Sequence, residues 1–177
     1  MSSNIDQLAA QAIRQSLSDI ATEVGHEFKE NFRRQAFFSQ AWPRRKAKIR
    51  EGSLLIDTGT LRNSIIAQVQ GDNVVFTSSE PYAQIHNDGG TIVVTTRMKR
   101  YFWAKFNQEN HGWSKSGSDL STKAEFYKAM AMKRVGSKIT IPKRQFIGWS
   151  DEVQQLVMQI VRTNLGNYLN NVQITFD

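Results

Sequence analysis

The longest periodic segment of the sequence covers residues 4–38, and it restricts the fold more than any other feature. Its apolar side chains recur at every third or fourth residue, which is the spacing of one face of an α-helix. A straight helix of this span would be about 50 Å long, whereas a compact chain of 177 residues is about 40 Å across. The sequence therefore predicts either a helix that projects and needs a partner for its apolar face, or a break at Gly25 into two packed helices.

Basic residues gather in a stretch that begins near the end of this segment. Residues 29–50 contain eight basic residues and one acidic residue, Glu30, so they carry the whole net charge of +7. The rest of the chain is balanced, with 15 basic and 15 acidic residues. Such a concentration is typical of a surface that binds nucleic acid or another polyanion. The alternative is a charged loop that is only solvated.

Downstream of the basic stretch, the pattern predicts both strands and helices. Strands are expected at 65–69, 74–77, 138–141 and 172–176, the first two as a hairpin around Gly71-Asp72-Asn73, and residues 91–95 are expected as another strand or an extended arm. Helices are expected at 97–106, 123–134 and 151–168, the last with Ser150 as its N-cap. Residues 81–86 are expected as a short helical or irregular link, and residues 107–121, rich in Gly, Ser and Asn, as a flexible loop.

The predicted fold class is α+β, a small antiparallel sheet with long N-terminal and C-terminal helices packed on it. We expect one domain over residues 1–177, in which 1–38 form the long helix, 39–54 a basic loop and 55–177 the α+β body. A chain of this length buries enough apolar surface to fold without disulfides, and it has no cysteine to form them.

Sequence signatures of catalysis are missing. The absence of cysteine excludes thiolate metal sites and cysteine nucleophiles, and no phosphate-binding loop, nucleophile elbow or zinc-protease motif is present. His86-Asn87-Asp88 is a weak match to a nuclease metal trio, but nothing else completes a ligand set. No secretion signal or apolar run of about 20 residues is present. We therefore expect a protein without enzyme activity, cofactor, metal or membrane span.

The segment 97–106 combines aromatic and basic residues and admits two interpretations. Tyr101, Phe102, Trp103 and Phe106 are flanked by lysines and arginines, as in elements that bind membranes or nucleic acids. On a helix, however, these aromatic residues would cover most of the circumference. This distribution favours burial in the core or in a subunit interface.

Three motifs follow one another in the second part of the chain. D-T-G-x-L-x-x-S begins at Asp57, Y-A-x-x-H-x-x-G at Tyr82 and P-x-R-x-F-x-G at Pro142. In this order they resemble the phage virion morphogenesis family, which includes Mu G-like and tail completion proteins and is similar to the tail-terminator and tail-component proteins of tailed phages. The resemblance covers residues 55 to about 165. The first 50 residues and residues 107–120 contribute no motif to it.

The resemblance implies a structural role in tail completion or head–tail joining, with no active site. It implies a tail-terminator-like ring subunit, often hexameric, at the head-proximal end of the tail, and therefore partners among its own copies, the tail-tube protein and neck or connector proteins. The implied location is the tail or neck of the virion, after assembly in the host cytoplasm. The motif residues expected to serve the fold or a subunit interface are Asp57, Gly59, Leu61, Arg62, Tyr82, His86, Gly89, Pro142, Arg144, Phe146 and Gly148. Of these, Arg62 and Arg144 are favoured as interface charges.

A ring also suggests a place for the basic stretch. Five of its residues are candidates to face the lumen and contact DNA there, namely Arg44, Arg45, Lys46, Lys48 and Arg50. They could equally contact protein. Two other functions stay open from the sequence: a stand-alone DNA-binding or packaging protein, and a capsid-assembly accessory that is not retained in the virion.

Overall fold

The computed structural model describes residues 2–45, 54–109 and 122–170, and within it the chain forms two compact units. The first, here called the long-helix unit, consists of Met1–Ala41, Leu55–Ala83 and Gln145–Asp177. The second, the aromatic-helix unit, consists of Trp42–Leu54 and Gln84–Arg144. The chain therefore leaves the long-helix unit twice and returns to it twice.

The predicted long helix is one uninterrupted element, α1 (Ser2–Arg34), and the break predicted at Gly25 is wrong. Helices in proteins are held mainly by tertiary packing, and Gly25 is buried at the contact between α1 and a hairpin. The helix ends at Arg34 rather than Phe38, because Gln35 has a φ of 54° and leaves the helical conformation. The chain then forms the short antiparallel pair β1 (Ala36–Phe37) and β2 (Gln40–Ala41), which turns Phe37 into the core.

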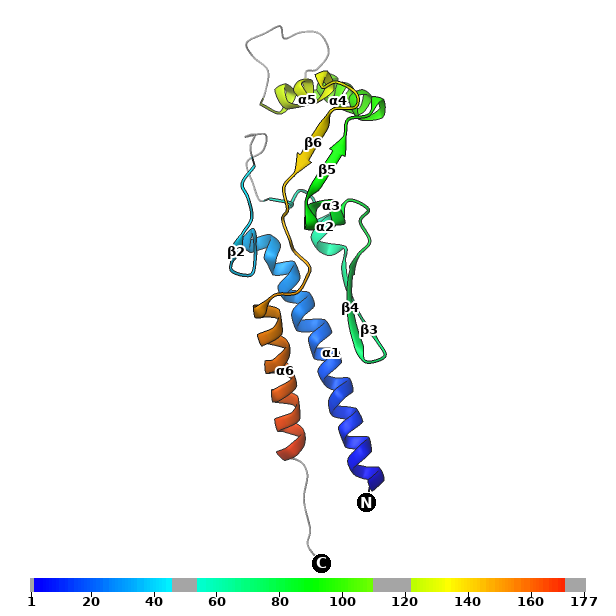
Figure 1. The fold of residues 1–177 in the computed structure, drawn as a ribbon, viewed down its shortest axis with the longest axis vertical. Helices are drawn as coiled ribbons and strands as arrows, with labels where there is room; N and C mark the ends of the chain where they lie inside the picture. Colours follow the sequence, from blue (N-terminus) through cyan, green and yellow to red (C-terminus); the bar gives the residue numbers. More distant parts are fainter. Residues whose placement is uncertain (1, 46–53, 110–121, 171–177) are drawn as a thin grey trace, which may run out of the picture. The chain divides into compact units, whose positions relative to one another are not determined.

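The hairpin predicted after the first motif is confirmed. It consists of β3 (Ile65–Gln70) and β4 (Asn73–Ser78), paired antiparallel with Ile65 opposite Ser78 and Gln70 opposite Asn73. The two-residue connection Gly71-Asp72 has the composition that such hairpins favour, and Gly71 has a φ of 59°. One face of this hairpin packs along α1 (Figure 1).

The C-terminal helix is α6 (Asp151–Asn170), which runs antiparallel to α1 and beside it (Figure 1). Its predicted N-cap is confirmed, since the Ser150 hydroxyl accepts a hydrogen bond from the Val153 N–H at 3.3 Å. Farther along, the Asn164 amide donates to Asp19 Oδ2 at 2.8 Å and to Ser16 Oγ at 3.3 Å. Helix α6 is therefore fixed to α1 both by apolar packing and by polar contacts.

The aromatic-helix unit contains most of α3 (Ala83–Asp88) and the elements β5, α4, α5 and β6. Strands β5 (Gly90–Val93) and β6 (Lys138–Ile141) pair antiparallel, and between them in sequence lie α4 (Thr96–Glu109) and α5 (Thr122–Met132), which pack together. The predicted helices are confirmed, but α4 continues to Glu109 and so includes the first residues of the predicted 107–121 loop. The remainder of that loop lies outside the described residues.

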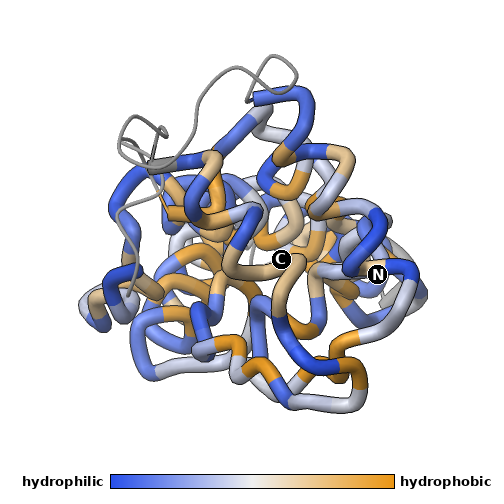
Figure 2. Tube along the Cα trace, turned by 90° about the horizontal axis from the view of Figure 1, so that it is seen from above, coloured by the Kyte–Doolittle hydropathy of each residue, from blue (hydrophilic) through white to orange (hydrophobic). Residues whose placement is uncertain are grey.

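The α+β class is confirmed, with one difference in the sheet. The described strands form three separate two-stranded sheets instead of one. The strand predicted at 172–176 lies outside the described residues. Hydropathy changes every few residues along the chain (Figure 2), and none of the described helices is long and apolar enough to cross a membrane.

Candidate assembly surface

The first motif forms a tight turn before the β3–β4 hairpin. Gly59 has a φ of 82°, a left-handed conformation that suits glycine, and it begins the short helix α2 (Thr60–Asn63). Leu61 is 4% exposed, whereas Asp57 and Arg62 are exposed. The first motif therefore supplies one anchor to the core of the long-helix unit and leaves two charged side chains at the surface.

The second and third motifs meet within the aromatic-helix unit, although they are more than fifty residues apart in sequence. The backbone N–H of Arg144 donates to the carbonyl of His86 at 2.8 Å. Gly89 has a φ of 73°, and a Cβ atom at this position would lie 2.7 Å from the backbone nitrogen of Lys143. Gly89 thus permits both the turn and the close approach of the two chain segments. Pro142 directly follows β6.

Arg144 is 7% exposed and contacts the basic stretch at Pro43, just before Arg44. Its Nε donates to the carbonyl oxygen of Pro43 at 3.0 Å. Burial, followed by the nearby charge of Arg45, lowers the pKa of this guanidinium from its ordinary value. The same environment lowers the pKa of His86, first through burial and then through the positive charge of Arg144. In this chain Arg144 therefore makes contacts within the fold.

The second half of the third motif lies in the core of the long-helix unit. Phe146 is 1% exposed, and its ring centroid is 4.9 Å from that of Phe32 on α1. Gly148 follows it and is half-buried. The third motif therefore contributes Arg144 to one unit and Phe146 to the other. Tyr82, from the second motif, is 40% exposed, and its pKa is raised, first by burial and then by a hydrogen bond with Glu80.

Asn31 is a structural residue that the sequence reasoning did not identify. It is fully buried on α1, and its amide donates to the carbonyl of Phe146 at 3.3 Å. Its Oδ1 accepts a hydrogen bond from the backbone N–H of Phe38 at 3.0 Å. In the sequence, only its position beside Phe32, on the apolar face of the helix, indicates that Asn31 is buried. A buried polar side chain needs hydrogen-bond partners.

Part of the basic stretch is neutralised by neighbours on α1. Arg33 forms an ion pair with Glu30 at 2.5 Å, and this hydrogen bond lowers the pKa of the Glu30 carboxyl. Arg34 pairs with Glu27 at 2.6 Å. Of the five candidates for DNA contact, Arg44 is exposed and Arg45 is half-buried. Lys46, Lys48 and Arg50 lie outside the described residues, so contact of these five residues with DNA stays a prediction.

The prediction that the aromatic helix α4 is buried in the core is wrong. None of its residues is buried, and Tyr101 and Trp103 are 55% and 40% exposed. One side of α4 packs on α5, where the ring of Phe102 lies 6.1 Å from Phe126 and 6.2 Å from Tyr127. The exposed aromatic side chains remain available for a subunit interface, and burial there stays a prediction.

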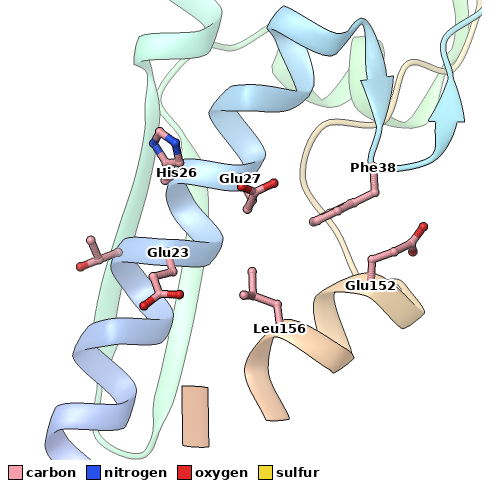
Figure 3. Close-up of a pocket in the computed structure, with 7 residues that line it drawn as sticks. Glu23, His26, Glu27, Phe38, Glu152 and Leu156 are labelled. Carbon is pink, nitrogen blue, oxygen red and sulfur yellow. The ribbon is translucent and has the colours of Figure 1, made fainter. Parts of the chain in front are cut away.

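A groove of about 500 Å³ lies between α1 and the beginning of α6 (Figure 3). The side chains around it are those of Thr22, Glu23, His26, Glu27, Phe38, Glu152 and Leu156. Glu27 is paired with Arg34, and Glu152 accepts a hydrogen bond from the Ser39 hydroxyl at 2.6 Å. This bond lowers the pKa of the Glu152 carboxyl. Two of the three carboxylates are thus already used by contacts within the fold.

Large apolar side chains are exposed in both units. In the long-helix unit the most exposed are Trp149, at 67%, and Leu169, at 66%, and in the aromatic-helix unit Met132 reaches 66%. Where such side chains form a contiguous patch, they mark sites of association. Among the described residues, no group of three or more His, Asp or Glu side chains is arranged to hold a metal ion.

Comparison with known proteins agrees with the motifs. The model of the phage virion morphogenesis family matches residues 3–166. The chain is also similar to Mu-like prophage FluMu G protein 2 of Haemophilus influenzae, with 42% identity over 50 residues. That alignment covers 28% of this chain and 35% of the prophage protein, so the similarity spans about a third of that relative. No solved structure matches the chain. The resemblance inferred from the motifs is thereby confirmed.

Proposed function

The chain belongs to the phage virion morphogenesis family, and we propose that it acts in tail completion or head–tail joining as a subunit of a ring at the head-proximal end of the tail. The family is a structural and morphogenetic one, not a family of enzymes. The observation that carries the proposal is the family match over residues 3–166, which includes α1 as well as the three motifs.

The surface of the chain supports self-association. Trp149, Leu169 and Met132 are each about two-thirds exposed, and contacts between copies would remove such side chains from water. On α1, Ile13 is 53% exposed, so part of the apolar surface of this helix is also open to another copy. The proposed partners are further copies of the chain, the tail-tube protein, and neck or connector proteins. The proposed location is the tail or neck of the virion, after assembly in the host cytoplasm.

Native mass spectrometry tests the ring directly. The full chain is measured over a range of concentrations, alone and with the tail-tube protein of its own phage. We expect one closed oligomer of defined size, such as a hexamer, under at least one condition. A chain that stays monomeric under all of them would overturn the proposal.

Contact between the basic stretch and DNA in the lumen is a separate part of the proposal. If Arg44, Arg45, Lys46, Lys48 and Arg50 each neutralise one phosphate, the logarithm of the binding constant should fall against log salt with a slope of about −4.5. The measurement is fluorescence anisotropy of a duplex with the assembled ring at several salt concentrations. Binding that is absent or independent of salt would show instead that these residues face protein.

The second candidate function is a DNA-binding or capsid-assembly accessory that is not retained in the virion. The observation that favours it is the concentration of the whole net charge in residues 29–50. Such a protein would bind DNA as a monomer or dimer. The ring proposal instead expects little affinity before assembly, so DNA titration below and above the assembly concentration separates the two.

A further inference from the structure

The charged residues of the chain are divided unequally between the two units. The aromatic-helix unit contains 17 lysines and arginines but only 5 aspartates and glutamates, whereas the long-helix unit contains 6 and 11. Outside residues 29–50 the two signs balance in number, but they do not balance within either unit. The aromatic-helix unit is therefore strongly basic, and the long-helix unit is acidic. A surface of the first is expected to attract a surface of the second in another copy of the chain.

One side of helix α4 is exposed and combines positive charge with aromatic rings. Arg97, Arg100 and Tyr101 are exposed at helical spacings of three and four residues, and the exposed Trp103 borders them. These four residues are here called the α4 face. The one acidic residue of α4, Glu109, is half-buried and forms an ion pair with α5. The α4 face therefore contains cations without a carboxylate among them.

The composition of the α4 face favours a protein as its partner. Tyr, Trp and Arg are enriched at the centres of protein–protein interfaces, where Lys is depleted. Contact with the phosphates of duplex DNA requires positive charge but no exposed rings, whereas Tyr101 is 55% and Trp103 40% exposed. Two α4 faces would repel each other, because each belongs to a unit with a large positive charge. The partner surface should therefore be acidic.

The long-helix unit has an acidic surface in the groove between α1 and the beginning of α6, here called the acidic groove (Figure 3). Glu23 is exposed there and forms no ion pair with another described residue. Glu152 adds a second carboxylate, and Phe38 and Leu156 add apolar surface to the same groove. The acidic groove thus matches the α4 face both in charge and in apolar character.

We propose that the α4 face of one copy docks in the acidic groove of a neighbouring copy. In this arrangement its arginines meet Glu23 and Glu152, and its rings meet Phe38 and Leu156. Trp103 and Glu23 are both exposed in the single chain, so each is open to a second copy. The two surfaces differ, which makes the contact head-to-tail and able to close a ring. The inference rests on the self-association proposed above and names the contact that produces it.

Charge reversal tests the contact under the condition in which the wild-type chain forms its ring. Arg100→Glu and Glu23→Arg should each raise the concentration needed for half-assembly at least about tenfold, because each places like charges across the contact. The double variant Arg100→Glu/Glu23→Arg pairs opposite charges again and should return to within about threefold of the wild-type value. A double variant that assembles no better than the single variants would overturn the inference.

Two matched controls carry the same changes of charge outside both surfaces. Arg162→Glu, at an exposed residue of α6, corresponds to Arg100→Glu, and Glu125→Arg, at an exposed residue of α5, corresponds to Glu23→Arg. Both controls should assemble like the wild-type chain, and all variants should keep its helical circular dichroism. Controls that impair assembly as strongly as the reversals at the contact would show that total charge decides assembly, and would overturn the inference.

Cysteine crosslinking separates a contact between copies from one within a copy, and the chain has no native cysteine. Asn107→Cys, beside the α4 face, and Thr22→Cys, at the acidic groove, leave the proposed charges unchanged. The two variants, mixed and oxidised, should form a disulfide between different chains. Ile13→Cys, exposed on α1 but outside the groove, is the control and should not crosslink to Asn107→Cys. An internal bridge in monomers of Asn107→Cys/Thr22→Cys, below the assembly concentration, would overturn the inference.

The wild-type chain separates the failure of this inference from the failure of the proposed function. If it forms its ring but the single reversals assemble equally well, the inference fails and the proposed function stands. If the wild-type chain forms no ring, both fail. Binding of DNA to the unassembled chain that Arg100→Glu abolishes, with assembly unchanged, would assign the α4 face to nucleic acid instead.

Discussion

The long-helix unit and the aromatic-helix unit differ in where their aromatic side chains lie. In the first, Phe28, Phe32 and Phe146 are 2% exposed or less and contact other aromatic rings. In the second, α4 has no buried residue, and Tyr101 and Trp103 are largely exposed. The same residue type therefore stabilises the fold in one unit and remains available for partners in the other.

This difference shows why aromatic content alone does not predict a core. In α1 the aromatic residues are spaced so that they share one face, and that face is covered from two sides by α6 and the hairpin. In α4 they are spread around the helix, and α5 covers one side of it. Substitutions of the buried rings on α1 should thus change stability, whereas those on the exposed side of α4 should change association.

The largest expected effect comes from removing a buried ring. Phe32→Ala should lower the free energy of unfolding by about 3–5 kcal/mol, because it deletes a fully buried side chain and leaves a cavity. Trp103→Ala, on the exposed side of α4, should change it by less than about 1 kcal/mol. Urea denaturation followed by circular dichroism measures both. Equal losses of unfolding free energy in the two variants would contradict the difference between the buried rings of α1 and the exposed rings of α4.

The next effect concerns the buried asparagine of α1. Asn31→Ala removes the hydrogen bonds that the buried Asn31 side chain makes to the carbonyl of Phe146 and the N–H of Phe38, and should cost roughly 2–4 kcal/mol. Asn107→Ala, on the exposed surface of α4, is the matched control and should be nearly neutral. The same denaturation experiment applies. A neutral Asn31→Ala would mean that these bonds do not join α1 to the third motif.

A smaller difference is expected between two glycines of the aromatic-helix unit. Gly89 and Gly136 both have positive φ, at 73° and 85°, so alanine strains the backbone at either position. Only at Gly89 would the added Cβ also meet the backbone of Lys143. Gly89→Ala should therefore cost about 1–3 kcal/mol more than Gly136→Ala. Thermal unfolding of the two variants measures this difference. Equal losses of stability would show that the second motif does not approach the third closely at Gly89.

The smallest effect is a dependence of stability on pH through His86. Its pKa is lowered in the folded chain, first by burial and then by Arg144, so the unfolded state binds the proton more readily. The stabilisation is complete above the unfolded pKa of about 6.5 and is lost as the pH falls below it. Between pH 7.5 and 5.5 the wild-type chain should lose more unfolding free energy than His86→Gln. Parallel pH profiles for the two chains would contradict the assigned environment of His86.

The features predicted correctly from sequence are mostly local. The hairpin follows from Gly71-Asp72 between two β-branched runs, the start of α6 from Ser150, and α1 from its apolar period. The errors arise where distant contacts decide. Gly25 does not break α1, because the hairpin packs against it. Phe37 continues the apolar pattern of α1 but belongs to β1.

The candidate site was predictable as a set of residues but not as an arrangement. The three motifs identified the family, yet nothing in their sequence indicates that Arg144 meets His86 and Pro43 while Phe146 enters the other unit. Arg144 is about sixty positions from His86 and about a hundred from Pro43 in the sequence. The role of Asn31 depends on Phe146 in the same way. A single sequence contains no local signal for such contacts.

Imaging of assembled particles tests the central claim most directly. Cryo-electron microscopy of purified particles, with and without this chain, should show a ring at the head-proximal end of the tail that is present only when the chain is. Fitting its helical pair α1 and α6 into that density identifies the subunit. Particles whose tails are complete without the chain, or that contain no density for it at the tail or neck, would contradict the account.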